Sequence, residues 1–138
     1  IHYHTDLQLL GVIGGGKMDN CSLGRAGEKL AENFLKKKGY EILEKNFWCR
    51  YGEIDLIAKD KGYLSFIEVK FCRDLNFILP QEKITKSKQE KITKVAQYYL
   101  NFRKIKLDFR FDVILIVEDN FKTKIELIKN AFWVKERI

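Results

Sequence analysis

The strongest constraint on the fold is a helical segment that lies between two segments with the pattern of buried strands. The strands are expected at Tyr63–Phe71 and Phe109–Val117, and the second is apolar on both faces, as a central strand is. Between them, apolar residues recur at the three-four spacing of one helix face: Ile92, Val95, Ala96, Tyr99 and Phe102. A strand–helix–strand crossover joins parallel strands, so part of the sheet is predicted to be parallel.

A first helix and two further strands are predicted before this crossover. The helix is capped by Asn20 or Ser22 and ends before Gly39, and its apolar residues again recur at three-four spacing. Strands are expected next at Tyr40–Phe47 and Gly52–Lys59. This part of the chain therefore supplies one helix and one side of the sheet.

The crossover helix and the end of the chain have boundary signals of their own. Ser87 and Glu90 have the spacing of a capping box, which predicts that the helix begins there. A last strand is expected at Lys124–Ile128, followed by a closing segment at 130–134. The predicted fold class is α/β, with a central mixed β-sheet flanked by helices.

Length and composition fit one compact domain. The chain has 138 residues, 46% of them hydrophobic and 33% charged, with a single proline and no repeat that would mark a boundary. Residues 21–138 are expected to form this domain. Because the only methionine, Met18, follows three glycines, residues 1–20 are interpreted as a leader that is disordered or was added before the natural start.

The charge balance favours a polyanionic partner. Lys and Arg total 26 against 19 Asp and Glu, giving a net charge of +7, which favours nucleic acid first and an anionic membrane surface second. No stretch approaches the roughly 18 consecutive apolar residues of a membrane span, so no membrane partner is expected. The three cysteines lack the spacing of a zinc site, which favours reduced thiols in a cytoplasmic protein.

The chemistry is expected at a hairpin around Lys61-Gly62. A two-residue turn there pairs Asp60 with Tyr63 and, by counting back along both strands, Asp55 with Glu68. Directly opposed residues share a face, with Cβ atoms roughly 5 Å apart. A slip of one residue would separate the two acids, so this register is a specific prediction.

Two carboxylates this close repel each other unless a positive charge lies between them. Mg²⁺ is suited to such a site because it binds one or two carboxylates together with water and substrate phosphate. Lys70 projects from the same face as Glu68 and could orient a water molecule for attack on a phosphodiester. The alternative is a Glu68–Lys70 salt bridge on a wet sheet face. The apolar neighbours of both acids favour the metal, because buried charges need a partner.

Five segments in order carry a family resemblance. They are Gly24-Arg25-Ala26-Gly27-Glu28, Gly52-Glu53-Ile54-Asp55-Leu56-Ile57, Phe66-Ile67-Glu68-Val69-Lys70, Arg110-Phe111-Asp112-Val113 and Asn130-Ala131-Phe132. Together they resemble the bacterial YraN family (UPF0102), which is related to Holliday-junction resolvases. The resemblance implies the restriction-endonuclease-like three-layer fold of the PD-(D/E)XK nucleases, with Mg²⁺ or Mn²⁺ as cofactor and DNA as substrate.

The resemblance also implies roles for individual residues. Asp55 and Glu68 would be metal ligands, with the carbonyl of Val69 as a third. Lys70 would serve the nucleophilic water, and Glu28 would bind a second ion or a water on the first. From helical geometry, Glu28 falls at the edge of the apolar stripe, where it can face a cleft; a solvated glutamate near the helix N-terminus is an equal alternative.

Nucleic-acid contacts are predicted at Lys88, Gln89, Arg50 and Arg73. Lys88 lies one turn before Ile92 and so faces the sheet, and with Gln89 it resembles the family's motif at the start of this helix. A solvated helix charge is the alternative.

Arg50 belongs to an aromatic-basic cluster with Phe47, Trp48 and Tyr51. This cluster is interpreted as a stacking surface for an unpaired base or as an ordinary sheet edge. Asp112 is expected to be a buried structural acid that is hydrogen-bonded to Arg110 or to an amide.

The predicted function is metal-dependent endonuclease cleavage of DNA phosphodiester bonds, by analogy with resolvases at branched or junction structures. The alternative is a nucleic-acid-binding protein that retains the nuclease fold without turnover. An intact Asp-Glu-x-Lys set favours the enzyme, since a binding module has no need to crowd two acids. A homodimer is left open as a partner.

Overall fold

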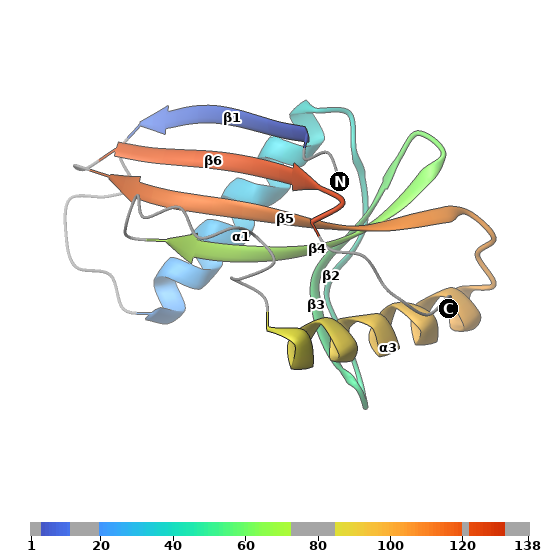
Figure 1. Ribbon diagram of the computed structural model, residues 1–138. Helices are drawn as coiled ribbons and strands as arrows, with labels where there is room; N and C mark the ends of the chain where they lie inside the picture. Colours follow the sequence, from blue (N-terminus) through green and yellow to red (C-terminus); the bar gives the residue numbers. More distant parts are fainter. Residues whose placement is uncertain (1–3, 12–19, 73–84, 120–121, 132–138) are drawn as a thin grey trace.

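The computed structural model describes residues 4–11, 20–72, 85–119 and 122–131. Helices α1 and α3 span Asn20–Lys37 and Lys86–Arg103. The strands are β1 (His4–Gly11), β2 (Glu41–Cys49), β3 (Gly52–Asp60), β4 (Tyr63–Cys72), β5 (Asp108–Asp119) and β6 (Lys122–Lys129). They form a six-stranded sheet in the order β1-β6-β5-β4-β3-β2, which is drawn in Figure 1.

The sheet is mixed, as the crossover predicts. β4 and β5 are parallel and joined through α3, whereas the other neighbouring pairs are antiparallel. The α/β class and the three-layer restriction-endonuclease-like arrangement are therefore confirmed. Strong twist turns β2 and β3 steeply away from β1 and β6 (Figure 1).

Each face of the sheet is covered by one helix. The face under α3 is filled by an apolar cluster that includes Ile92, Val95 and Tyr99 of the helix. The other face packs on α1 through Ala31, Phe34 and Leu35. The alternation of side chains along the central strands β4 and β5 supplies both clusters, which is why apolar residues lie on both faces of these strands.

The β3–β4 hairpin has the predicted register. Asp60 pairs with Tyr63, and the pairing continues to Leu56 and Ile67. Lys61 in the two-residue turn adopts a φ of 56°.

Two helix details differ from the sequence prediction. The N-cap of α3 is Thr85, whose side chain accepts a hydrogen bond from the Lys88 amide, so the predicted start at a Ser87–Glu90 capping box is wrong. Thr85 takes this place because its backbone is extended, whereas Ser87 already lies inside the helix. Phe102, expected in the buried stripe, is 61% exposed because it lies in the last turn at the stripe's edge.

The predicted leader includes a strand. Residues 4–11 form β1, which pairs with β6 at the edge of the sheet, so this part is not disordered; that it was added before the natural start stays a prediction. The boundary of the domain at residue 21 stays a prediction. Part of the closing segment, residues 132–134, lies outside the described residues.

Asp112 is a structural acid, as expected. It is 1% exposed and accepts hydrogen bonds from Arg110, Ser65 and the Asn130 amide. Arg110 also donates to Asp60 at 2.7 Å, so a buried guanidinium joins acids of two strands. Within the described residues, no helix is long and apolar enough to cross a membrane.

Candidate functional site

The two predicted acids come from neighbouring strands. The pairing of β3 with β4 reaches Leu56–Ile67, and Asp55 and Glu68 are the next residues on the two strands, close enough for their charges to interact. Asp55 is half-buried and accepts a hydrogen bond through Oδ2 from the Val69 amide at 2.8 Å. Glu68 is 7% exposed. The fold therefore shields both carboxylates, in full or in part, from bulk water.

Crowding is visible in the titration of Asp55. Burial and, after it, the charges of Glu68 and Glu28 raise the pKa of Asp55 to about 7, against the opposing effect of the Val69 hydrogen bond. A shift of this kind marks a carboxylate that lacks sufficient positive charge nearby. The Asp55 carboxylate is therefore the member of the site that gains most from a bound cation.

Two lysines form ion pairs with the Glu68 carboxylate. Lys88 Nζ of α3 is 2.6 Å from Glu68 Oε1, and Lys70 Nζ of β4 is 3.6 Å from the same oxygen. Burial and the neighbouring Lys88 ammonium lower the pKa of Lys70. Burial acts in the same direction on Lys88, but the hydrogen bond and charge of Glu68 outweigh it and raise the pKa of Lys88. The Glu68–Lys70 salt bridge considered from the sequence is present, and the shorter contact belongs to Lys88.

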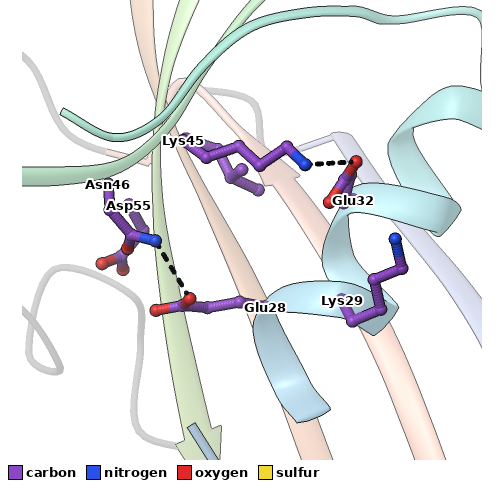
Figure 2. A pocket seen from close by; sticks show the side chains of 7 residues that line it. Glu28, Lys29, Glu32, Lys45, Asn46 and Asp55 are labelled. Carbon is purple, nitrogen blue, oxygen red and sulfur yellow. Dashed lines mark hydrogen bonds and ion pairs between the residues drawn. The ribbon is translucent and has the colours of Figure 1, made fainter. Parts of the chain in front are cut away.

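Glu28 reaches the site from α1. It lines a pocket of about 170 Å³ together with Asp55 and Asn46. Figure 2 shows the Glu28 side chain extending from α1 toward these two residues, where its Oε2 accepts a hydrogen bond from Asn46 Nδ2 at 3.3 Å. Glu28 therefore faces a pocket that Asp55 also lines, and both alternatives for its role stay predictions.

A glycine allows α1 to come this close. A Cβ atom at Gly27 would overlap the ring of Phe71 on β4 and would approach Ile116 Cδ1 of β5 to 3.2 Å. A side chain at this position would force the Phe71 ring to move, so the glycine allows the helix to lie this close to the sheet. Because Glu28 is the next residue, the close approach also sets the distance from its carboxylate to the β3–β4 acids.

Asn46 was not identified from the sequence. It lies opposite Asp55, between the β2–β3 pairs Lys45–Leu56 and Phe47–Ile54, and its φ is 50°. Asparagine tolerates this left-handed conformation better than most residues. An asparagine inside a strand pattern was the available signal, but only the structure shows that it contacts Glu28.

The other predicted nucleic-acid contacts are dispersed. Gln89 lies half-buried beside Lys88 in the first turn of α3. Arg50 lies at the β2–β3 turn, with its guanidinium 4.7 Å from the centre of the Tyr51 ring. Arg73 lies outside the described residues.

The donors suit a hard divalent cation, although the acids are not gathered into a cluster. Asp55, Glu68 and Glu28 offer only oxygen ligands, which Mg²⁺ and Mn²⁺ prefer. In the part of the chain that the structure describes, no group of three or more His, Cys, Asp or Glu residues is placed to hold a metal ion. Glu68 is bound to Lys88 and Glu28 to Asn46. The metal roles of these acids and of the Val69 carbonyl stay predictions.

Comparison with known proteins gives a consistent family. The chain is 50% identical over 119 residues to a UPF0102 protein of Caldicellulosiruptor bescii, covering 83% of this chain and 100% of the relative. A UPF0102 protein of Caldicellulosiruptor saccharolyticus is 46% identical over 118 residues, with the same coverage. One from Clostridium botulinum is 46% identical over 119 residues, covering 83% of this chain and 97% of the relative. The model of the "Uncharacterised protein family UPF0102" matches residues 27–116, which include every acid and lysine of the site, and the chain belongs to this family.

Proposed function

We propose that the protein is a metal-dependent endonuclease that hydrolyses phosphodiester bonds in DNA, with Asp55 and Glu68 as ligands of Mg²⁺ or Mn²⁺. The observation that carries the proposal is the crowding of Asp55. Its carboxylate is half-buried and its pKa is raised to about 7 by burial and by the Glu68 and Glu28 charges. A divalent cation would relieve this repulsion and would keep both acids ionised.

Each side chain of the site then has a distinct task. A bound divalent ion would polarise the phosphoryl group and lower the pKa of a water molecule. The lowered pKa of Lys70 increases the fraction of its amine that is unprotonated and so able to accept a proton from that water. Lys88, released from Glu68 by the ion, would contact the negatively charged phosphate. Asn46 would hold Glu28 in place for a second ion or for a water on the first.

The charge of the whole chain supports a nucleic-acid substrate. A net charge of +7 attracts phosphates without regard to sequence. We take DNA in the cytoplasm as the working substrate, with branched or junction DNA as the form suggested by the resolvase resemblance.

A non-catalytic nucleic-acid-binding protein is the second candidate, and one contact favours it. Glu68 is already neutralised by the Lys88 ammonium at 2.6 Å, so the site is partly satisfied without a metal. Such a protein would bind DNA through its surface lysines, and its DNA affinity would not change when the acids are neutralised.

Cleavage of linear, flapped and four-way DNA with Mg²⁺ or Mn²⁺ tests the proposal. Asp55→Asn keeps the shape of the side chain and removes its charge, so turnover should fall by roughly a hundredfold or more. Lys70→Ala should still bind Mn²⁺ but should cleave poorly. Glu41→Gln, which removes an exposed acid from β2, is the matched control and should cleave like the wild type.

The outcomes separate the two candidates. Metal-dependent cleavage that disappears in Asp55→Asn supports the enzyme. A wild type that binds every DNA as tightly as Asp55→Asn and cleaves none would rule the enzyme out in favour of the binding protein.

A further inference from the structure

A group of aromatic rings, two exposed and one half-buried, lies where α3 meets the β2–β3 turn. Tyr98 is 38% exposed and Phe102 is 61% exposed, one helical turn apart. Their rings are stacked, with centroids 6.0 Å apart and planes at 7°. Tyr51 of the β2–β3 turn adds a third ring, 6.5 Å from Tyr98. We call Tyr51, Tyr98 and Phe102 the aromatic platform.

The platform is supported from below. Phe47 of β2 lies 6.3 Å from Tyr98 and packs edge-on against the buried Tyr99 at 4.9 Å. The turn that carries Tyr51 lies close to the helix, since a Cβ at Gly52 would be in van der Waals contact with Val95 at 3.6 Å. The exposed rings therefore rest on packed side chains, which keeps the entropy cost of ordering them low when a partner binds.

Positive charges surround the platform. The Arg50 guanidinium lies 4.7 Å from the Tyr51 ring centre, and that of Arg103, which is also paired with Glu44 at 2.7 Å, lies 5.3 Å from the Phe102 ring centre. Lys91 and Lys94 are exposed on α3, seven and four residues before Tyr98. At 3.6 residues per turn these spacings place both lysines on the face that carries Tyr98 and Phe102. One helix face thus presents two ammonium groups followed by two stacked rings.

We propose that the aromatic platform binds the bases of an unpaired nucleic-acid strand. Aromatic rings stack on bases of any sequence, and the surrounding cations neutralise phosphates of the same strand. Lys88, the lysine on Glu68, begins the same stripe, and at 1.5 Å per residue Tyr98 and Phe102 follow it by about 15 and 21 Å along the helix axis. A strand bound to the platform would run along α3 toward the carboxylates of Asp55 and Glu68. The proposal deepens the nuclease function by naming the form of its substrate.

Charge favours this occupant over a second copy of the chain. Two copies meeting through this surface would bring Arg50, Lys91 and Lys94 of one against the same cations of the other. A nucleic-acid strand supplies the opposite charge together with flat rings.

The test measures binding in EDTA, so that it does not depend on cleavage. The probes are a fluorescent single-stranded oligonucleotide, a strand of the same length made of abasic units, and a blunt duplex. The wild type is compared with Tyr98→Ala/Phe102→Ala and with Tyr98→Phe/Phe102→Tyr, which keeps both rings. Trp48→Ala is the control: the sequence pattern grouped Trp48 with Arg50 and Tyr51, but its ring is 74% exposed and, by strand alternation, lies on the opposite face of β2 from Phe47 and hence outside the platform.

The expected result is a loss of about tenfold or more in affinity of the double-alanine variant for the base-containing strand, with little change for the abasic strand. The ring-preserving variant and Trp48→Ala should bind like the wild type, and thermal melting checks that each variant folds.

Equal affinity of the wild type and the double-alanine variant for the base-containing strand would overturn the proposal. The proposal would also be overturned if the wild type sedimented as a dimer and the double-alanine variant as a monomer. Failure of the nuclease function leaves the binding result standing, because these measurements contain no metal.

Discussion

At the scale of single residues, Asp55 links the charge of the site to the stability of the fold. Its pKa rises from 3.8 to about 7 on folding, so between these values the folded state holds a proton that the unfolded state has lost. The contribution of this proton to the free energy of unfolding is fully present below about pH 4 and is lost as the pH rises through about 7. In metal-free buffer, the free energy of unfolding should therefore fall across this range, by a few kcal/mol at most.

Urea unfolding of the wild type and Asp55→Asn checks this prediction. The variant cannot ionise at this position, so its stability should change less with pH and should exceed that of the wild type near pH 8. Adding Mg²⁺ at that pH should stabilise the wild type and leave the variant unaffected, because only the native carboxylate pair would bind the ion. If the free energy of unfolding of the variant depended on pH as that of the wild type does, Asp55 would not be the group responsible for the pH dependence.

Lys88 makes a second prediction at this scale. Its ammonium lies on the Glu68 oxygen that a metal would need, so ion and lysine compete for the same carboxylate. Lys88→Ala should bind Mn²⁺ several-fold more tightly in calorimetry, because a competing positive charge has been removed. Lys91→Ala removes an exposed charge one turn further along α3 and should change Mn²⁺ affinity much less. Unchanged or weaker Mn²⁺ binding by Lys88→Ala would contradict the competition.

The residues that could be predicted from the sequence are those joined by local geometry. A two-residue turn at Lys61-Gly62 is enough to bring Asp55 beside Glu68, because strand pairing extends from the turn by counting. The contact of Lys88 with Glu68 requires α3 to dock on the sheet, and the contact of Asn46 with Glu28 requires α1 to cross it. Neither docking geometry follows from periodicity, which indicates a buried face but not its depth or position.

At the scale of elements, the start of α3 makes a third prediction. Thr85 accepts a hydrogen bond from the Lys88 amide at 3.2 Å, so Thr85→Ala should lower the free energy of unfolding by about 1 kcal/mol. Ser87 lies one residue inside the helix and is exposed, so Ser87→Ala should be neutral or slightly stabilising because alanine has the higher helix propensity. Thermal or urea unfolding of both variants measures which one is less stable. A larger loss of stability in Ser87→Ala than in Thr85→Ala would favour the capping box.

The same helix explains one error of the sequence analysis. Phe102 continues the three-four spacing of Ile92, Val95 and Tyr99, so periodicity alone counts it with the core. Instead its ring stacks on Tyr98, and this pair joins the aromatic platform. The spacing was sufficient to identify the helix and its buried face, but it does not tell where along the helix the sheet ceases to cover it.

At the scale of the whole molecule, the excess of basic residues makes a fourth prediction. With a net charge of +7, DNA binding should release counterions, so the logarithm of the affinity should fall linearly with the logarithm of the salt concentration. Fluorescence anisotropy in EDTA at several salt concentrations measures the slope. Lys91→Ala/Lys94→Ala should reduce its magnitude by about 2 if both lysines contact phosphates. Affinity that does not depend on salt would remove the phosphate backbone as the main partner.

The topology of the sheet has a consequence for how the protein acquires its site. β3 and β4 are joined by a two-residue turn and can meet within about microseconds, whereas the parallel pairing of β4 with β5 must await closure of a loop that contains α3. The acids thus become neighbours early, and Lys88 arrives only when that helix docks. We expect the nascent chain to pass through a stage in which its two carboxylates repel each other without the lysine, so its folding should be faster in mildly acidic buffer than in alkaline buffer.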